Sequence, residues 1–170
     1  KNEASGPSTI SNNLNTNGWY YWEAGSKALE ITGDWSNNSH VLWANSSETL
    51  TFSGIVSGST ATRVYNGGTI ALTNDGNTFT GTPDATYNST IQFSTIDNIG
   101  VNSSLGAGSA INFDIANQDR SGYYENIGAG GSSDRSITFN SDSGNTTAGI
   151  ANNGTGALNL SGTFSNASGT

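Results

Sequence analysis

The sequence contains neither cysteine nor methionine among its 170 residues. Without cysteine, disulfide bonds and thiolate chemistry are excluded. Without methionine there is no initiator residue, so we expect Lys1 to begin a processed chain or a piece of a longer one. The acidic composition, rich in Asn, Ser, Thr and Gly, favours a secreted or bacterial cell-surface location.

Positive charge is also scarce. Five Lys and Arg residues stand against thirteen Asp and Glu residues, and the formal net charge is −8. Binding to phosphate groups needs clustered positive charge, so we expect no nucleic-acid partner and no attraction to anionic membranes. The sequence has no apolar run of roughly 18 residues, the length of a membrane-spanning helix, so we expect no insertion into a membrane by this segment.

Hydrophobic residues are few, at 32% of the chain, but they recur at regular intervals. A four-residue pattern places Leu or Ile first and Ile, Leu or Phe third, between mostly polar residues. It occurs at residues 29–32, 50–53, 70–73, 91–94, 111–114, 137–140 and 158–161, with steps of 21, 20, 21, 20, 26 and 21. Polar sequences of this composition are often disordered, but the alternation indicates short strands with one buried face.

A strand that returns about every 21 residues is typical of a solenoid whose coils pair in parallel. We therefore predict an all-β fold, a parallel β-helix of about seven coils of 20–21 residues that spans residues 29–170. Stacking of all seven units would give one inward column of first residues and a second column containing Phe52, Phe93, Phe113 and Phe139. The fourth residues, such as Thr32 and Ser94, would form an outward polar row.

Residues 1–28 lack the repeat and are predicted to be an N-terminal cap segment, which covers the open end of a solenoid. Its aromatic residues are Trp19, Tyr20, Tyr21 and Trp22. We interpret them as packing against the first coil; the alternative is a platform on which a carbohydrate stacks.

The step of 26 between Ile111 and Ile137 predicts a loop insertion near residues 118–135. Insertions in solenoids lie in loops on one side and often form the binding surface. Candidate ligand-contacting residues in this insertion are Arg120, Tyr123, Tyr124 and Glu125. The alternative is a glycine-rich loop with ordinary surface ion pairs, each worth under about 1 kcal/mol.

The third unit continues as Asn-Thr-Phe-Thr-Gly at residues 77–81, then Ser-Thr-Ile at 89–91 and Leu-Gly at 105–106. This stretch resembles the autotransporter-associated β-strand repeat. That family usually has Gly-Thr-Leu where Ser89 to Ile91 stand, and a Thr-rich strand in the region of Pro83 and Asp84. The resemblance covers about one repeat well. It implies a right-handed parallel β-helix from the passenger region of a secreted bacterial surface protein, with a stalk or adhesin role.

Catalytic chemistry has little support in the sequence. Some polysaccharide-cleaving enzymes are β-helices, and stacked coils could bring Asp75, Asp97 and Asp119 together because they are 22 residues apart. Isolated acids in turns, however, usually cap backbone donors. The single histidine, His40, and the lack of calcium-loop motifs predict no metal and no cofactor. We therefore expect a protein that is not an enzyme.

The resulting hypothesis is a non-enzymatic structural or adhesive module of a secreted bacterial surface protein, resembling an autotransporter passenger stalk or adhesin. Its expected partners are further copies of the chain at the solenoid ends and a host or bacterial surface glycan or protein. Two alternatives remain: a self-assembling extracellular filament subunit that stacks through its coil ends, and a glycan-binding or glycan-cleaving β-helix.

Overall fold

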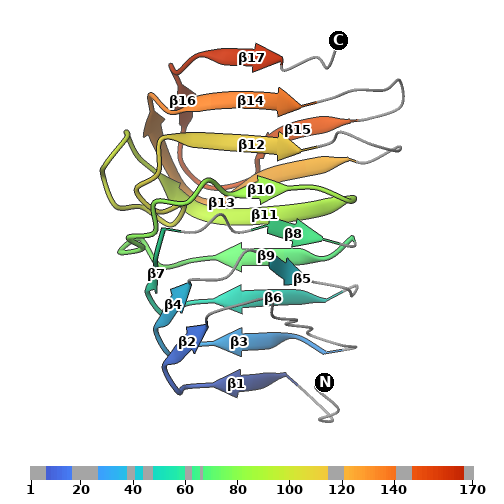
Figure 1. The fold of residues 1–170 in the computed structure, drawn as a ribbon, viewed down its shortest axis with the longest axis vertical. Coiled ribbons are helices and arrows are strands. Elements are labelled where there is room, and N and C mark those ends of the chain that lie inside the picture. The colour runs from blue at the N-terminus through green and yellow to red at the C-terminus, as the bar shows by residue number, and fades with distance from the viewer. Residues whose placement is uncertain are drawn as a thin grey trace.

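The computed structural model describes residues 7–16, 27–37, 41–43, 48–59, 63–65, 67–114, 121–140 and 147–166. All regular secondary structure in these ranges is β-strand (Figure 1). Trp19, Tyr20, Tyr21, Trp22 and Arg120 lie outside the described residues. The prediction of an all-β fold is confirmed for the described part of the chain.

The largest sheet in the described residues, called sheet 1 below, runs along the long axis of the molecule (Figure 1). Its strands follow each other in chain order. They are β1 (Ser8–Ile10), β3 (Leu29–Ile31), β6 (Thr49–Phe52), β9 (Thr69–Leu72), β11 (Ser89–Ile96), β13 (Gly122–Ser133) and β15 (Ala148–Asn152), and β16 (Leu158–Leu160) pairs with the second half of β13.

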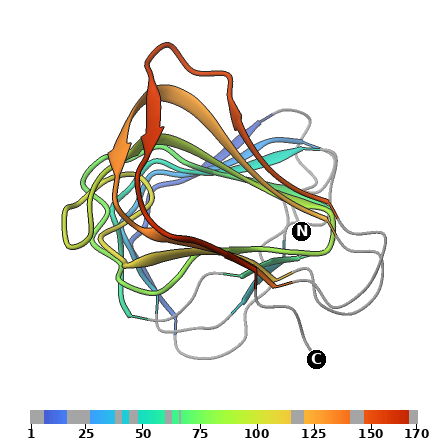
Figure 2. The same cartoon turned by 90° about the horizontal axis from the view of Figure 1, so that it is seen from above.

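Two further sheets of described strands complete the fold. Sheet 2 contains β5 (Val41–Trp43), β8 (Arg63–Tyr65), β10 (Asp84–Ala85), β12 (Ala110–Asp114), β14 (Ser136–Asn140) and β17 (Phe164–Asn166). Sheet 3 contains β2 (Leu14–Thr16), β4 (Trp35–Asn37) and β7 (Val56–Ser57). Strand pairs are parallel in all three sheets, as predicted. Seen down the long axis, the strands lie over one another around a common interior (Figure 2).

The chain leaves sheet 1 and returns to it after one circuit, and the circuits differ in length. Leu29 pairs with Leu50, Leu50 with Ile70, and Ile70 with Ile91, which gives steps of 21, 20 and 21 residues. The next circuit takes 33 residues, from Ile91 to Tyr124. This regular parallel return is consistent with the predicted β-helix.

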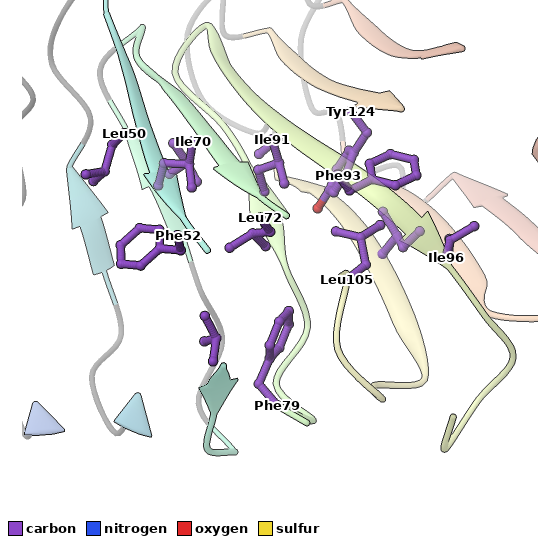
Figure 3. Packing of buried hydrophobic residues seen from close by; sticks show 14 of the residues in the cluster. Leu50, Phe52, Ile70, Leu72, Phe79, Ile91, Phe93, Ile96, Leu105 and Tyr124 are labelled. Atoms are coloured by element: carbon purple, nitrogen blue, oxygen red, sulfur yellow. The ribbon is translucent and has the colours of Figure 1, made fainter. Parts of the chain in front are cut away.

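The predicted inward columns hold for the first units of the repeat. Figure 3 shows Leu50, Ile70 and Ile91 in one row, with Phe52 and Leu72 beside it. These five side chains are buried in the apolar core. Parallel pairing in register places like residues over one another, so each circuit adds a layer to a continuous interior.

The prediction that all seven units share one column is wrong. Ile111 pairs with Ile137, and Phe113 with Phe139, but these pairs belong to sheet 2, whereas Phe52 and Phe93 belong to sheet 1. Leu158 is in β16. The alternation of apolar and polar residues identifies a strand but not the sheet that contains it. The unit at Ile111 falls inside the 33-residue circuit from Ile91 to Tyr124, so its strand belongs to another sheet than β11 and β13.

The predicted cap segment, residues 1–28, already contains strands of the sheets. Ser8 pairs with Leu29 and Ile10 with Ile31, so β1 is the first strand of sheet 1. The stacking therefore begins before residue 29. Only Ile10 carries the apolar side of this strand into the core, which is why the four-residue pattern is absent there.

The described part of the predicted loop insertion at 118–135 contains a strand. Residues 122–133 form β13, the longest described strand, which pairs with β11 on one side and with β15 and β16 on the other. The excursion from the regular path lies instead at residues 97–109, between β11 and β12.

The predicted polar row links successive circuits by hydrogen bonds. Thr32 Oγ1 donates to the carbonyl of Ile10 at 3.4 Å, and Thr73 Oγ1 to that of Phe52 at 3.3 Å. Ser94 Oγ donates to the carbonyl of Thr73 at 3.1 Å. Small hydroxyl residues at the fourth position therefore satisfy backbone acceptors of the preceding circuit at the corner of the sheet.

Candidate binding surface on the outer face of β13

The outer face of β13 carries three side chains that project away from the core. Tyr123, Glu125 and Ile127 alternate with the buried Tyr124 and Asn126. Tyr123 and Ile127 are each 38% exposed, and Glu125 is half-buried. This alternation follows from the period of a strand. Two residues that the sequence assigned to ligand contact, Tyr123 and Glu125, are thus held on a regular sheet.

Tyr124, the third of these candidates, points into the core. Its hydroxyl donates to the carbonyl of Asn112 at 3.1 Å, and its ring meets Phe113 edge to face at 4.9 Å between centroids. Burial, with a smaller contribution from the charge of Asp84, raises the pKa of the Tyr124 phenol well above its ordinary value. With 1% of its surface exposed, Tyr124 is a core residue.

A hollow of about 390 Å³ lies over β13 and β15 beside Tyr123. Its lining comprises Thr90, Tyr123, Tyr124, Glu125, Gly149, Ile150 and Ala151. The strand register explains the arrangement. Thr90, Tyr123 and Gly149 are paired in one row across three strands, and Glu125 and Ala151 are paired in a second row two positions further on. The small residues of β15 leave the space that the hollow occupies.

The Tyr123 ring lies against Gly149. A Cβ atom at Gly149 would come within 3.1 Å of Tyr123 Cδ1 and 3.4 Å of Cε1. These distances are at or below ordinary van der Waals contact, so the glycine provides the room in which the ring rests. The position of the ring therefore depends on a residue one circuit later in the chain.

The carboxylate of Glu125 is fixed by two amide side chains from neighbouring circuits. Gln92 Nε2 donates to Glu125 Oε2 at 2.8 Å, and Asn153 Nδ2 donates to Oε1 at 2.6 Å. Hydrogen bonds to a charged acceptor are stronger than those between neutral groups. Together the three side chains form a polar row beside the hollow. Sequence reasoning missed Gln92 and Asn153, because they lie 33 and 28 residues from Glu125 and their approach depends on the lengths of the two circuits on either side of it.

A second feature absent from the sequence predictions is the excursion at residues 97–109, which is held by Arg135. This side chain is buried, and it donates to the carbonyl of Leu105 at 2.7 Å and to that of Gly106 at 2.5 Å. Burial lowers the pKa of the guanidinium, and the nearby carboxylates of Asp97 and Asp134 oppose this effect. Arg135 thus fixes the shape of the excursion from within.

Asp75 and Asp97, which the sequence suggested as possible catalytic acids, accept hydrogen bonds from neighbouring groups. Asp75 Oδ1 accepts from the hydroxyls of Ser94 and Thr95, both at 2.8 Å. Asp97 Oδ1 accepts from the amide of Asn98 at 2.8 Å. Asp119 lies outside the described residues. In the described ranges no three His, Cys, Asp or Glu side chains gather as metal ligands would, and no helix there has the length and hydropathy needed to cross a membrane.

A curated relative of the chain is the "Adhesin BmaC autotransporter" of Brucella suis biovar 1 (strain 1330). The chain is similar to an autotransporter adhesin. The two sequences are 36% identical over 141 residues, which is 83% of this chain, and the chain spans about 3% of the length of that relative. No protein-family model matches the chain. No solved structure matches it.

Proposed function

We propose that the chain is a segment of a right-handed parallel β-helix and acts as a non-enzymatic structural or adhesive module of a secreted bacterial surface protein. The observation that carries this proposal is the register of sheet 1. In sheet 1, each described strand from β3 to β15 pairs in parallel with the strand one circuit earlier. Parallel strands joined by a crossover are right-handed in the great majority of proteins, which supports the proposed hand.

The similarity to an autotransporter adhesin supports the location and the role. That relative carries the words adhesin and autotransporter in its name, and 83% of this chain aligns with it. The chain corresponds to a passenger stalk or adhesin segment, in which function consists of length, rigidity and display. The net charge of −8 is compatible with an extracellular segment that extends into the solvent and is not bound along an anionic membrane.

The proposal of a non-enzymatic role is supported by the use of the described acids. Asp75 accepts hydrogen bonds from two hydroxyls of β11, Asp97 from a backbone amide, and Glu125 from two amide side chains. Such carboxylates stabilise turns and link circuits.

Surface display in a non-adhesive bacterium tests this function. The chain, fused to a heterologous autotransporter translocation domain, is expected to become accessible to extracellular protease and to raise attachment to epithelial monolayers. A fusion with the same composition in scrambled order is the control. Retention inside the cell, or attachment no greater than with the scrambled chain, contradicts the proposal.

A filament subunit is the second candidate, because apolar surface is present at the C-terminal end of the stack. Phe164 on β17 is 54% exposed, and its ring follows that of Phe139 at 6.5 Å. Among the described strands, β17 has a partner on one side only, and such an edge is a template for another strand. Electron microscopy separates the candidates: discrete short rods are expected for a stalk, whereas long fibres that disappear with Phe164→Ser identify a filament subunit.

A further inference from the structure

We propose that the hollow beside Tyr123 binds a neutral pyranose unit of a glycan. The ring of Tyr123 would stack on the sugar, and the row formed by Gln92, Glu125 and Asn153 would bind its hydroxyl groups. This inference rests on the proposed adhesive function and names the ligand class for it.

The aromatic part of the site is an exposed tyrosine on a flat surface. Tyr123 stands between Thr90 and Gly149 in its row, so one side of the ring rests on the glycine and the ring remains 38% exposed. Tyrosine combines a large apolar face with a polar tip, which suits a surface site that is partly wet. The C–H face of a pyranose ring is an apolar surface of matching size.

The polar part of the site lies one row away, on the next outward residue of β13. An ionised carboxylate has about four acceptor positions, and Glu125 uses two for Gln92 and Asn153. Each amide retains a second N–H and a carbonyl oxygen. Carboxylate and amide groups together accept from and donate to neighbouring hydroxyls, which is the pattern that a sugar edge presents.

The charge of the site selects among sugars. The hollow is lined by one carboxylate and by no Lys or Arg, and the whole chain has a net charge of −8. An anionic sugar would meet unfavourable charge at Glu125 without a compensating cation. A neutral pyranose is therefore favoured over a sialylated or uronic-acid ligand.

The size and stiffness of the site favour a small ligand over a protein surface. At about 390 Å³ the hollow lies at the lower end of the range for small-molecule pockets. β13 is paired on both sides, and the Glu125 carboxylate is held by two donors. A site that is already ordered loses little conformational freedom on binding, which benefits a ligand with few contacts.

Saturation-transfer NMR and calorimetry on the purified chain test the inference with four soluble probes: cellobiose, lactose, N,N′-diacetylchitobiose and 3′-sialyllactose. Saturable binding is expected for at least one of the neutral disaccharides and weaker binding for 3′-sialyllactose. Tyr123→Ala is expected to weaken binding about tenfold, the effect of losing one stacked ring, whereas Tyr123→Phe retains it. Ile127→Ala is the matched control, because Ile127 has the same exposure on the same face of β13 but does not line the hollow.

A second variant protects the test against misfolding of Tyr123→Ala. Gly149→Ala leaves Tyr123 unchanged but displaces its ring through the close Cβ contact, and it is expected to weaken sugar binding without removing an aromatic group. Absence of saturable binding for all neutral probes, equal binding by wild type and both variants, or a preference for 3′-sialyllactose overturns the inference.

The same variants separate this inference from the proposed function. Attachment of displaying cells that is unaffected by Tyr123→Ala retains the adhesive function and overturns the glycan site as its basis. Sugar binding by the purified chain, together with a failure of surface display, supports the site and contradicts the proposed function.

Discussion

Glycines at one corner of the stack show how closely successive circuits approach each other. A Cβ atom on Gly54 would lie 2.2 Å from the carbonyl oxygen of Gly33, and one on Gly33 would lie 2.1 Å from that of Asn12. Both contacts are with backbone atoms, which cannot move away as a side chain can. The corner therefore requires residues without a side chain in this column.

We predict that Gly54→Ala destabilises the protein by about 3 kcal/mol, because the new methyl group forces two circuits apart. Urea denaturation followed by circular dichroism measures the change. Gly76→Ala is the matched control, since its three nearest atoms belong to the side chains of Asn74 and Ile55, the nearest at 3.1 Å. An equal loss in both variants would show that close backbone approach is not the cause.

The buried Tyr124 makes stability depend on pH in the alkaline range. Its pKa in the folded protein is raised above the ordinary value of 10.0 by burial. Above pH 10.0 the phenol of the unfolded chain therefore loses its proton while that of the folded protein keeps it. Because the unfolded state then binds fewer protons, the free energy of unfolding falls as pH rises from 10.0 toward the folded-state pKa.

We expect Tyr124→Phe to flatten this alkaline decline, although it also removes the hydrogen bond to Asn112 and lowers stability by about 1 kcal/mol at neutral pH. Urea titrations between pH 8 and 11 give both quantities. Tyr123→Phe, at the exposed neighbouring position, is the control. If the two variants have the same pH profile, the decline does not originate at Tyr124.

At the scale of the element, the excursion at residues 97–109 is held in place by hydrogen bonds between backbone amides and side chains. Ser104 Oγ accepts from the amides of Ser94 and Thr95 at 2.9 and 2.8 Å, at the point where the register between β11 and β13 shifts. Asp134 Oδ1 accepts from the amide of Ile99 at 2.8 Å. Side chains thus take the place of strand partners for these backbone amides.

We predict that Arg135→Met loosens this excursion while the sheets persist. The substitution removes the Arg135 donors to the carbonyls of Leu105 and Gly106, although Gly106 still accepts from Ser103 Oγ at 2.9 Å. A cost of about 2 kcal/mol follows for the buried Leu105 carbonyl that loses its donor. Hydrogen-exchange mass spectrometry is expected to show that residues 97–109 exchange faster in the variant than in the wild type, whereas exchange in β9 is little changed. Unchanged exchange at 97–109 would exclude Arg135 as the element that fixes it.

The sequence predicts the strands better than their places in the fold. Leu50 and Phe52 follow the period of a buried strand, and their depth in the core was predictable. Ile111 has the same local pattern but lies in sheet 2, because it falls inside the 33-residue circuit, between the passages of the chain through sheet 1 at Ile91 and Tyr124. Nothing local marks Arg135 as buried, since its partners are carbonyls about 30 residues away.

The candidate site was predictable in part for the same reason. Tyr123 and Glu125 stood out as recognition residue types in an irregular region of the repeat. Their neighbours Gln92 and Asn153 lie 33 and 28 residues away in the chain, at distances set by the lengths of individual circuits. Tyr124 differs from Tyr123 only in which face of the strand it occupies, and that phase required the structure.

At the scale of the whole molecule, the sheets form a stack in which each circuit contacts its immediate neighbours. Seven strands of sheet 1 in parallel order span roughly 30 Å at about 4.8 Å per strand. Burial decreases toward the C-terminal end: Tyr124 and Ile137 are buried, whereas Leu158 and Leu160 are half-buried and Phe164 is exposed. In stacks of this kind stability is a sum of local and nearest-neighbour contributions.

We therefore predict a gradient of hydrogen exchange along the stack. Amides of β9 and β11, which have partners on both sides, are expected to exchange slowest, and those of β1 and β17 at the two ends fastest. Hydrogen-exchange mass spectrometry on the native chain measures the gradient. Uniform protection from β1 to β17 would instead indicate a single cooperative unit.

The near-constant step between paired residues affects how the number of circuits can change in evolution. The step separates Leu29, Leu50, Ile70 and Ile91. Each of these circuits presents equivalent surfaces to its two neighbours. Duplication or deletion of the DNA that encodes one circuit is therefore expected to give a longer or shorter stack in which the contacts between circuits are kept. The 33-residue circuit that follows is not interchangeable with the others. Changes in the number of circuits are therefore expected to accumulate on the N-terminal side of the 33-residue circuit.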